Sequence, residues 1–187
     1  MSTKDPSLPD KLVAIDTALA ARGLAHAFGG ALALAYYAEP RATLDIDVNV
    51  FVPPAEHVQV LDALAPLGVD PRAGLSVIEG EGQARWWWGR TPVDLFFAYD
   101  EIHTAMRDAI RRVPFGDDYI PILAPEHLAV CKAVLDRPKD WIDIEQMLVG
   151  APDLDGNEVR GWLDRMLGVD DPRYARFAAL AERSDAR

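Results

Sequence analysis

The fold is decided by residues 29–52, which read GGALALAYYAEPRATLDIDVNVFV. The end of this stretch, residues 44–52, alternates between apolar and polar side chains and predicts a half-buried strand. The side chains expected to face the core are Leu44, Ile46, Val48 and Val50. Those expected to face water are Asp45, Asp47 and Asn49. An apolar run over 24–28 predicts a short strand before the glycine pair. The Ala- and Leu-rich residues 31–38 predict two helical turns that Pro40 ends.

Two carboxylates, Asp45 and Asp47, project from the same face of the predicted strand, about 6–7 Å apart because side chains alternate with a period of two. They repel each other unless a divalent cation lies between them. Oxygen ligands suit Mg²⁺, which completes its shell with waters and substrate phosphates. Asp94 interrupts an otherwise apolar strand and is a third candidate. The alternative interpretation of all three is an exposed strand face.

The glycine pair, Gly29 and Gly30, supplies the other half of a candidate site. It lets the backbone approach a ligand closely just before a helix, whose N-terminal N–H groups favour an anion. A phosphate there and metal ions at Asp45 and Asp47 would lie side by side if the two strands are neighbours. That is the geometry that phosphoryl or nucleotidyl transfer requires. A simple turn is the alternative interpretation of the pair.

The rest of the chain predicts an α+β fold, a small mixed sheet backed by helices and followed by a helical C-terminal part. The expected helices cover 6–22, 55–66, 101–112, 125–135, 138–149, 157–167 and 172–183. A hairpin is expected from strands over 83–88 and 92–98 around Gly89, Arg90 and Thr91, with an edge strand over 119–123 and weak strand signals over 75–78. We therefore expect an α/β core over 1–123 and a helical subdomain over 124–187, packed on the core.

The composition of the 187 residues is that of an ordinary globular protein, with 50% hydrophobic and 26% charged residues. No apolar run approaches the roughly 18–20 residues of a membrane span, and the N-terminus lacks the features of a signal peptide. A single cysteine leaves no Cys-rich zinc site to propose. We expect a cytoplasmic protein without a membrane partner. The net charge of −11 disfavours general binding to nucleic acid.

Four groups of residues resemble the DNA polymerase β-type nucleotidyltransferase superfamily, and most closely its bacterial AbiEii-like branch of abortive-infection toxins. They are Gly29-Gly30; Arg41-x-Thr43-x-Asp45-Ile46-Asp47; Ala124-Pro125-Glu126-His127-Leu128-x-x-x-Lys132; and Arg137-Pro138-Lys139-Asp140-x-x-Asp143-Ile144. The resemblance covers about residues 24–149. The glycine pair with the two acids marks the superfamily, and the lysine helix with the turn that follows it is more specific to the branch.

The resemblance implies that Asp45 and Asp47 bind two Mg²⁺ (or Mn²⁺) ions and that Asp94 helps to bind the one that activates the acceptor. It implies nucleotide or phosphate binding by Gly29, Gly30, Arg41, Thr43, Lys132 and Asp143. From the residues alone, Lys132 would snorkel outward or be held by a partner such as phosphate. Asp140 and Asp143 near a helix N-terminus are also favoured for stability alone.

The implied reaction is attack of an acceptor hydroxyl on the α-phosphate of a nucleoside triphosphate, with release of pyrophosphate. The acceptor could be a tRNA 3′ end, a protein or a small molecule, and a toxin role would add an antitoxin partner. Ala31 departs from the pattern, because many relatives carry Ser or Thr directly after the glycine pair. A catalytically degenerate nucleotide-binding or regulatory protein is therefore the alternative. A metal-dependent phosphohydrolase is a third interpretation.

Overall fold

The computed structural model describes residues 5–70 and 82–185 of the chain. The chain folds into two compact units, and neither unit is one continuous segment of the sequence. The first comprises Met1–Leu32 and Ala42–Ile122, and the second comprises Ala33–Arg41 and Leu123–Arg187. The weak strand expected over 75–78 lies outside the described residues.

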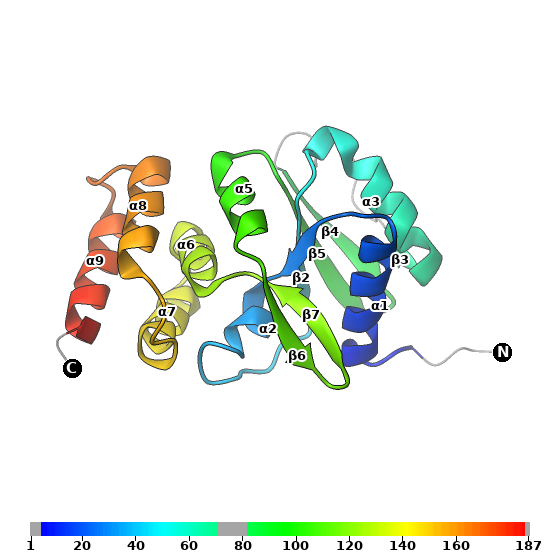
Figure 1. The fold of residues 1–187 in the computed structure, drawn as a ribbon, viewed down its shortest axis with the longest axis horizontal. Helices are drawn as coiled ribbons and strands as arrows, with labels where there is room; N and C mark the ends of the chain where they lie inside the picture. The colour runs from blue at the N-terminus through cyan, green and yellow to red at the C-terminus, as the bar shows by residue number, and fades with distance from the viewer. Residues whose placement is uncertain (1–4, 71–81, 186–187) are drawn as a thin grey trace. The chain divides into compact units, whose positions relative to one another are not determined.

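The first unit is built on an open mixed sheet whose described strands have the order β3-β4-β5-β2-β1-β7-β6 (Figure 1). The strands are β1 (His26–Phe28), β2 (Ile46–Val50), β3 (Val69–Asp70), β4 (Gln83–Trp88), β5 (Thr91–Phe97), β6 (Arg111–Phe115) and β7 (Asp118–Ile122). β2 pairs parallel with β5 and β1 pairs parallel with β7, whereas the other neighbours are antiparallel. The predicted α+β class with a mixed sheet is confirmed.

Helices of the first unit lie beside the sheet (Figure 1). They are α1 (Leu8–Ala21), α3 (His57–Leu64) and α5 (Glu101–Asp108), while α2 (Gly30–Leu34) continues into the second unit. Ser7 caps the start of α1: its hydroxyl accepts the backbone N–H of Asp10, while the Asp10 carboxylate accepts that of Ser7. Its apolar stripe, which includes Ile15 and Leu19, is fully buried. α1 and α3 pack against each other beside the sheet (Figure 1).

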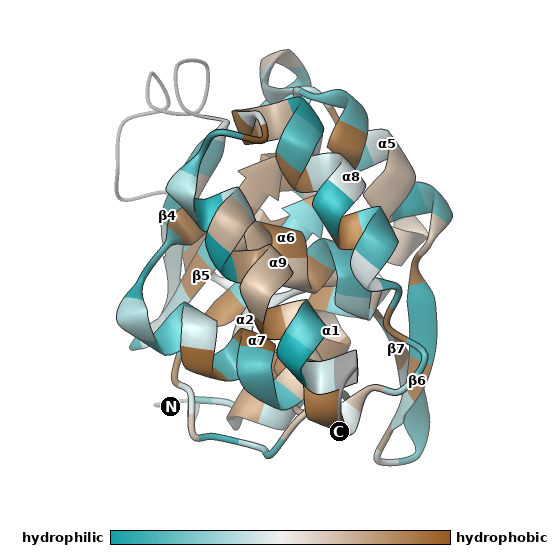
Figure 2. Ribbon diagram, turned by 90° about the vertical axis from the view of Figure 1, so that its left-hand side faces the viewer, coloured by the Kyte–Doolittle hydropathy of each residue, from teal (hydrophilic) through white to brown (hydrophobic). Residues whose placement is uncertain are grey.

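The second unit is a helical cluster around α6 (Pro125–Leu135). α6 contacts α7 (Pro138–Gly150), α8 (Gly156–Leu167) and α9 (Pro172–Asp185), and Figure 2 shows it as a mostly hydrophobic helix among more polar ones. Asp136 ends α6 in a left-handed conformation with a φ of 53°. Pro138 then starts α7 at the first turn, where its missing N–H costs no hydrogen bond.

The acidic strand is shorter than predicted. β2 begins at Ile46, so Leu44 is 80% exposed instead of facing the core. The Thr43 hydroxyl accepts the backbone N–H of Asp45 at 3.3 Å, a local turn that replaces strand pairing at this point. Asn49 is also buried, contrary to its predicted water-facing position. β2 is a central strand of the sheet, and such a strand is covered on both faces over part of its length.

The prediction of a helix over 101–112 is wrong for the last residues of that range. α5 stops at Asp108, and residues 111–115 form β6, which pairs with β7 through a two-residue turn. Gly116 opens that turn with a φ of 60°, and Pro114 is tolerated because β6 is the edge strand. β7 is therefore an inner strand and not the edge that the sequence predicts.

Candidate active site

A row of charged side chains crosses three neighbouring strands of the first unit. β2 and β5 run parallel in a register that places Asp47 directly beside Asp94. β4 is antiparallel to β5 and places Arg85 directly beside Asp94 on the other side. Adjacent members of the row are about 4.8 Å apart along the sheet. Asp45 lies one residue before β2, and its carboxylate is 3.9 Å from the Arg85 guanidinium. We call Asp45, Asp47 and Asp94 the carboxylate row.

The glycine pair lies against this row. The backbone N–H of Gly29 donates to the carbonyl oxygen of Asp47 at 3.0 Å. Gly30 has a φ of 54°, and a Cβ added there would overlap the carboxylate of Asp47. The position therefore requires glycine for two reasons, the left-handed backbone and the absence of a side chain. As a result, the backbone at Gly30 approaches the Asp47 carboxylate more closely than a residue with a side chain would allow.

Arg85 is bound to the carboxylate row by a bidentate ion pair. Its Nε and Nη2 atoms donate to the two oxygens of Asp94, each at 2.7 Å. Hydrogen bonding to Asp94 raises the pKa of the Arg85 guanidinium above its already high ordinary value, so the group is charged at any relevant pH. The Arg85 side chain is 52% exposed and that of Asp94 is 15% exposed. The pair lies at the surface of the sheet, open to an incoming ligand.

The donor set of the carboxylate row fits a hard divalent cation, because it consists of oxygen ligands that are partly open to solvent. Within residues 5–70 and 82–185, however, no three His, Cys, Asp or Glu side chains are arranged so that they could hold a metal ion as they stand. Both oxygens of Asp94 are engaged by Arg85 instead. The residues fit in type and register, and the orientation of Asp94 is that of an ion pair.

Arg85 is absent from the site predicted from sequence, although the signal for it exists. The predicted turn has three residues, which would place Trp86 opposite Asp94. The observed turn has two, Gly89 and Arg90, so Trp88 pairs with Thr91 and Arg85 pairs with Asp94. Gly89 has a φ of 61°, and a glycine at the first central position is typical of a type II′ hairpin turn. Counting back from that turn would have identified Arg85.

Three other predicted residues, Arg41, Lys132 and Asp143, form a separate cluster within the second unit. The Lys132 ammonium lies 2.6 Å from the Asp143 carboxylate and 3.9 Å from that of Asp140. Arg41 donates to both oxygens of Asp143, at 3.3 and 3.2 Å. Asp140 is fully buried and accepts two hydrogen bonds from the Arg137 side chain and one from its backbone. This cluster is an internal ion-pair network.

The network decides between the two local interpretations of Lys132. Its side chain is 4% exposed, so it does not snorkel to solvent, and the partner that holds it is a pair of aspartates. A phosphate role for Lys132, Arg41 or Asp143 stays a prediction. Thr43 lies outside the network, and its hydroxyl bonds the backbone of Asp45.

The tryptophan run divides between the two faces of β4. Trp86 and Trp88 are buried, at 0% and 8% exposed. Trp87 is half-buried and points to the same face as Arg85, two residues away along the strand. An aromatic ring therefore lies on the face of the sheet that carries the carboxylate row.

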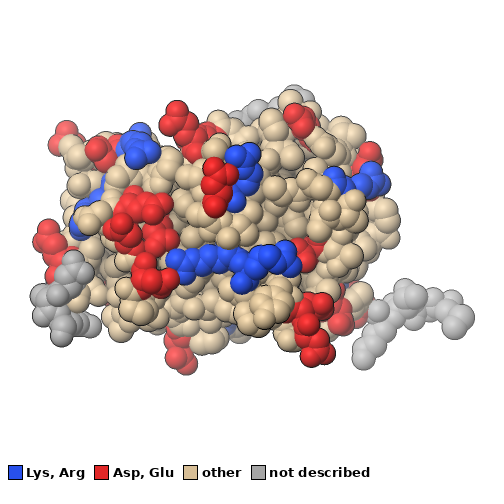
Figure 3. Space-filling model, in the orientation of Figure 1, with Lys and Arg blue, Asp and Glu red and all other residues tan. Residues whose placement is uncertain are grey.

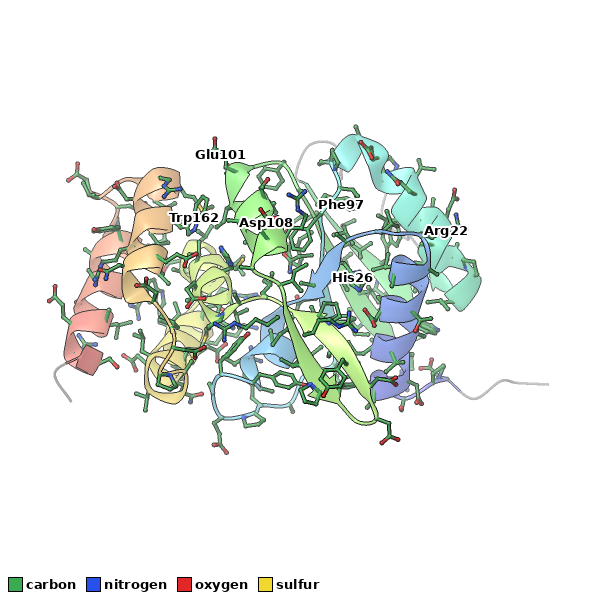
Figure 4. All side chains as sticks on the ribbon, viewed as in Figure 1. Arg22, His26, Phe97, Glu101, Asp108 and Trp162 are labelled. Atoms are coloured by element: carbon green, nitrogen blue, oxygen red, sulfur yellow. The ribbon has the colours of Figure 1, made fainter. Side chains whose placement is uncertain are left out.

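A buried histidine of the second unit, His127, lies close to acidic side chains. Both ring nitrogens of His127 lack a hydrogen-bond partner in the described parts of the chain, and burial lowers its pKa. The Glu158 carboxylate is 3.6 Å away, and its own pKa is raised by burial and then by the nearby acids Glu126 and Asp155. Figure 3 shows acidic side chains gathered near the start of α8. The ring of Trp162 in that helix, labelled in Figure 4, lies 6.4 Å from that of His127 between centroids.

A shallow hollow of about 600 Å³ also lies within the second unit, between residues 35–39 and α7. Ile142 and Val149 on its wall are more than half exposed, and burial raises the pKa of Tyr36. Among the residues that line it there is no predicted site residue. The hollow and the carboxylate row are therefore different features of the chain.

Over the two described stretches, no helix has both the length and the apolar character that crossing a membrane demands. No model of a known protein family matches the chain, and no curated protein matches it. Solved structures do. The antibiotic-resistance factor ANT(2'')-Ia in solution has 16% identity and a TM-score of 0.63, covering 98% of this chain and 100% of its own.

Two further solved structures are similar along most of the chain. An antigenic nucleotidyltransferase-like protein from Paracoccidioides brasiliensis has 14% identity and a TM-score of 0.55, with 92% of each chain covered. The lincosamide antibiotic adenylyltransferase LnuA, with lincomycin bound, has 12% identity and a TM-score of 0.53, covering 77% of this chain and 98% of its own. The chain has the nucleotidyltransferase fold. At these sequence identities the similarity establishes the fold alone. The chemistry must be argued from the residues of this chain.

Proposed function

We propose that the chain transfers a nucleoside monophosphate from a nucleoside triphosphate to a hydroxyl group of a small molecule. The observation that carries the proposal is the register of β2 with β5, which puts Asp47 beside Asp94 and Asp45 at the entrance of the same strand. Acids at this spacing, with a glycine backbone against them, suit phosphate chemistry better than they suit a stable exposed strand face.

In this proposal Asp45 and Asp47 hold Mg²⁺ or Mn²⁺, and Asp94 joins them. The bound cation supplies charge neutralisation of the triphosphate and a more acidic acceptor hydroxyl. The backbone of Gly29 and Gly30 lies directly against Asp47 of the row, and we place the phosphate groups beside it. The acceptor oxygen forms a bond to the α-phosphorus, the bond from that phosphorus to the bridging oxygen breaks, and pyrophosphate leaves. The hydroxyl proton passes to the carboxylate row.

Two observations support a small acceptor. The similar protein ANT(2'')-Ia is known in complex with adenylyl-2''-tobramycin, and LnuA is a lincosamide antibiotic adenylyltransferase. The net charge of −11 repels RNA and favours neutral or cationic molecules. In the described structure no feature favours a tRNA 3′ end, a protein hydroxyl, or an AbiEii-like toxin with an antitoxin partner over this class. We propose an antibiotic-like or polyamine-like hydroxyl compound.

Isothermal titration tests the proposal at the carboxylate row. Each of the four nucleoside triphosphates with Mg²⁺ is titrated into the wild type, into Asp45→Asn/Asp47→Asn, and into Asp62→Asn/Asp108→Asn, which removes two exposed charges elsewhere in the first unit. We expect Mg²⁺-dependent binding that is lost only in the first variant. Equal binding by all three proteins would show that the row does not take the nucleotide.

The competing function is nucleotide binding without catalysis, and Ala31 after the glycine pair favours it. A release assay for pyrophosphate, with a panel of aminated and neutral hydroxyl compounds as acceptors, separates the two. Steady pyrophosphate release supports transfer. Binding without release for every acceptor supports the non-catalytic function, and inorganic phosphate as the product would indicate a phosphohydrolase.

A further inference from the structure

Arg85 occupies the position in which a cation is needed. Its guanidinium binds both oxygens of Asp94 at 2.7 Å and lies 3.9 Å from the Asp45 carboxylate, while Asp47 is next to Asp94 in the sheet register. Asp45 and Asp47 also contribute electrostatically to the raised proton affinity of the guanidinium. The positive charge of Arg85 thus offsets part of the repulsion among the acids of the row.

A guanidinium and a divalent cation cannot share Asp94 at low cost. Both oxygens of the carboxylate are used by the planar fork of Arg85, and a dipositive ion beside it would face a positive charge at close range. Arg85 is attached to the open face of β4 by a long side chain that is half exposed. It can therefore leave Asp94 by rotation of its own side chain, without a change in the sheet.

We propose that Arg85 is a positioning residue that competes with the divalent cation for Asp94 and moves to the triphosphate when the nucleotide binds. This inference rests on the proposed function, because it assumes that the carboxylate row takes a cation with a nucleoside triphosphate. The triphosphate offers the guanidinium bidentate oxygen acceptors in exchange for those of Asp94. Metal and nucleotide therefore load together, and binding of metal alone is weak.

Mn²⁺ binding to the full chain, followed by electron paramagnetic resonance without nucleotide, tests the competition. We expect Arg85→Gln to bind Mn²⁺ more tightly than the wild type, on the order of tenfold. Arg90→Gln is the matched control, because it removes the same charge from the exposed turn of the same hairpin. It should bind as the wild type does. Arg85→Lys keeps the charge but loses the planar fork, and its affinity for Mn²⁺ should lie between those of the wild type and Arg85→Gln.

A second readout keeps the test decisive when binding of metal alone is too weak to measure. A non-hydrolysable nucleoside triphosphate analogue should increase Mn²⁺ affinity more in the wild type than in Arg85→Gln, because only the wild type has a guanidinium to displace. Added Mn²⁺ should also raise the melting temperature of Arg85→Gln more than that of the wild type. The inference would be contradicted if the analogue increased Mn²⁺ affinity less in the wild type than in Arg85→Gln. It would also be contradicted if Mn²⁺ raised the melting temperatures of the two proteins equally.

The outcomes separate this inference from the proposed function. If Asp45→Asn/Asp47→Asn abolishes Mn²⁺ and nucleotide binding but Arg85→Gln binds Mn²⁺ as the wild type does, Arg85 is only a structural counter-ion and the proposed function stands. If Asp45→Asn/Asp47→Asn binds Mn²⁺ and nucleotide unchanged, the carboxylate row is not the site and both proposals fail.

Discussion

At the level of single residues, the candidate site depends on the contact between Gly30, which has no side chain, and the Asp47 carboxylate. Gly30 adopts a left-handed conformation with its backbone against the Asp47 carboxylate. Any other residue would be strained by its φ angle and would also push Asp47 out of the row. The absence of a Cβ at Gly30 therefore leaves its place to the Asp47 carboxylate, and this effect can be separated from that of the left-handed backbone.

Gly30→Ala should lower the free energy of unfolding by more than the roughly 1–2 kcal/mol that the left-handed backbone alone costs. Gly116→Ala is the control, since Gly116 has a φ of 60° and nothing within 4 Å of its added Cβ. Denaturant unfolding of both variants gives the difference. Mg²⁺-dependent nucleotide binding should fall only in Gly30→Ala. Equal losses of stability would mean that Asp47 moves aside freely.

Among the elements, α6 combines mostly apolar residues with buried polar ones, and it is the helix around which the second unit packs. Lys132 is paired with two aspartates of α7, and His127 faces α8 without a hydrogen bond in the described residues. Buried charges that lose a partner are strongly destabilising, whereas a neutral buried imidazole resists protonation. These two residues thus make α6 sensitive to substitution and to pH, respectively.

Lys132→Met should destabilise the chain by about 3 kcal/mol, because it leaves Asp143 and Asp140 buried with less compensation. Lys139→Met removes an exposed lysine from the first turn of α7 and should change the free energy of unfolding by less than about 0.5 kcal/mol. Urea unfolding measures both. A folded, equally stable Lys132→Met variant with weakened nucleotide binding would instead favour the phosphate role.

The pH dependence of stability should include a contribution from His127. Burial lowers its pKa in the folded state below the ordinary value of 6.5, so the unfolded chain binds more protons between the two values. Stability from this group is complete above pH 6.5 and is lost as the pH falls toward the folded-state pKa, by at most about 1.4 kcal/mol per pH unit. Unfolding free energies of wild type and His127→Gln from pH 7.5 to 5 should diverge in this direction, and parallel curves would contradict the prediction.

Across the whole molecule, the chain passes between its two units more than once. Residues 33–41 leave the first unit between the glycine pair and the acidic strand and belong to the second. There the Tyr37 hydroxyl donates to the carbonyl oxygen of Leu123 at 2.8 Å, and Arg41 pairs with Asp143. A short segment from the first half of the sequence thus completes a helical unit from the second half.

Residues 124–187 alone should therefore be less stable than the same residues with 33–41 fused through a flexible linker. The fusion restores the Arg41 partner of Asp143, which we expect to contribute at least about 1 kcal/mol. Far-UV circular dichroism during urea unfolding of the two fragments measures the difference. Fragments of equal stability would support the boundary at residue 123 that the sequence predicts.

Local sequence patterns were sufficient for the α+β class, most helices, the acidic strand and the acids on it, because these follow from periodicity, capping and turn chemistry. The folded chain was needed to learn which strands are neighbours, and thus that Asp94 lies beside Asp47 and Arg85 beside Asp94. It was also needed to learn that β6 is a strand and that Lys132 is paired inside the second unit. Pairing between distant segments depends on the summed packing and hydrogen bonding of the whole sheet or helix cluster, which no local pattern encodes.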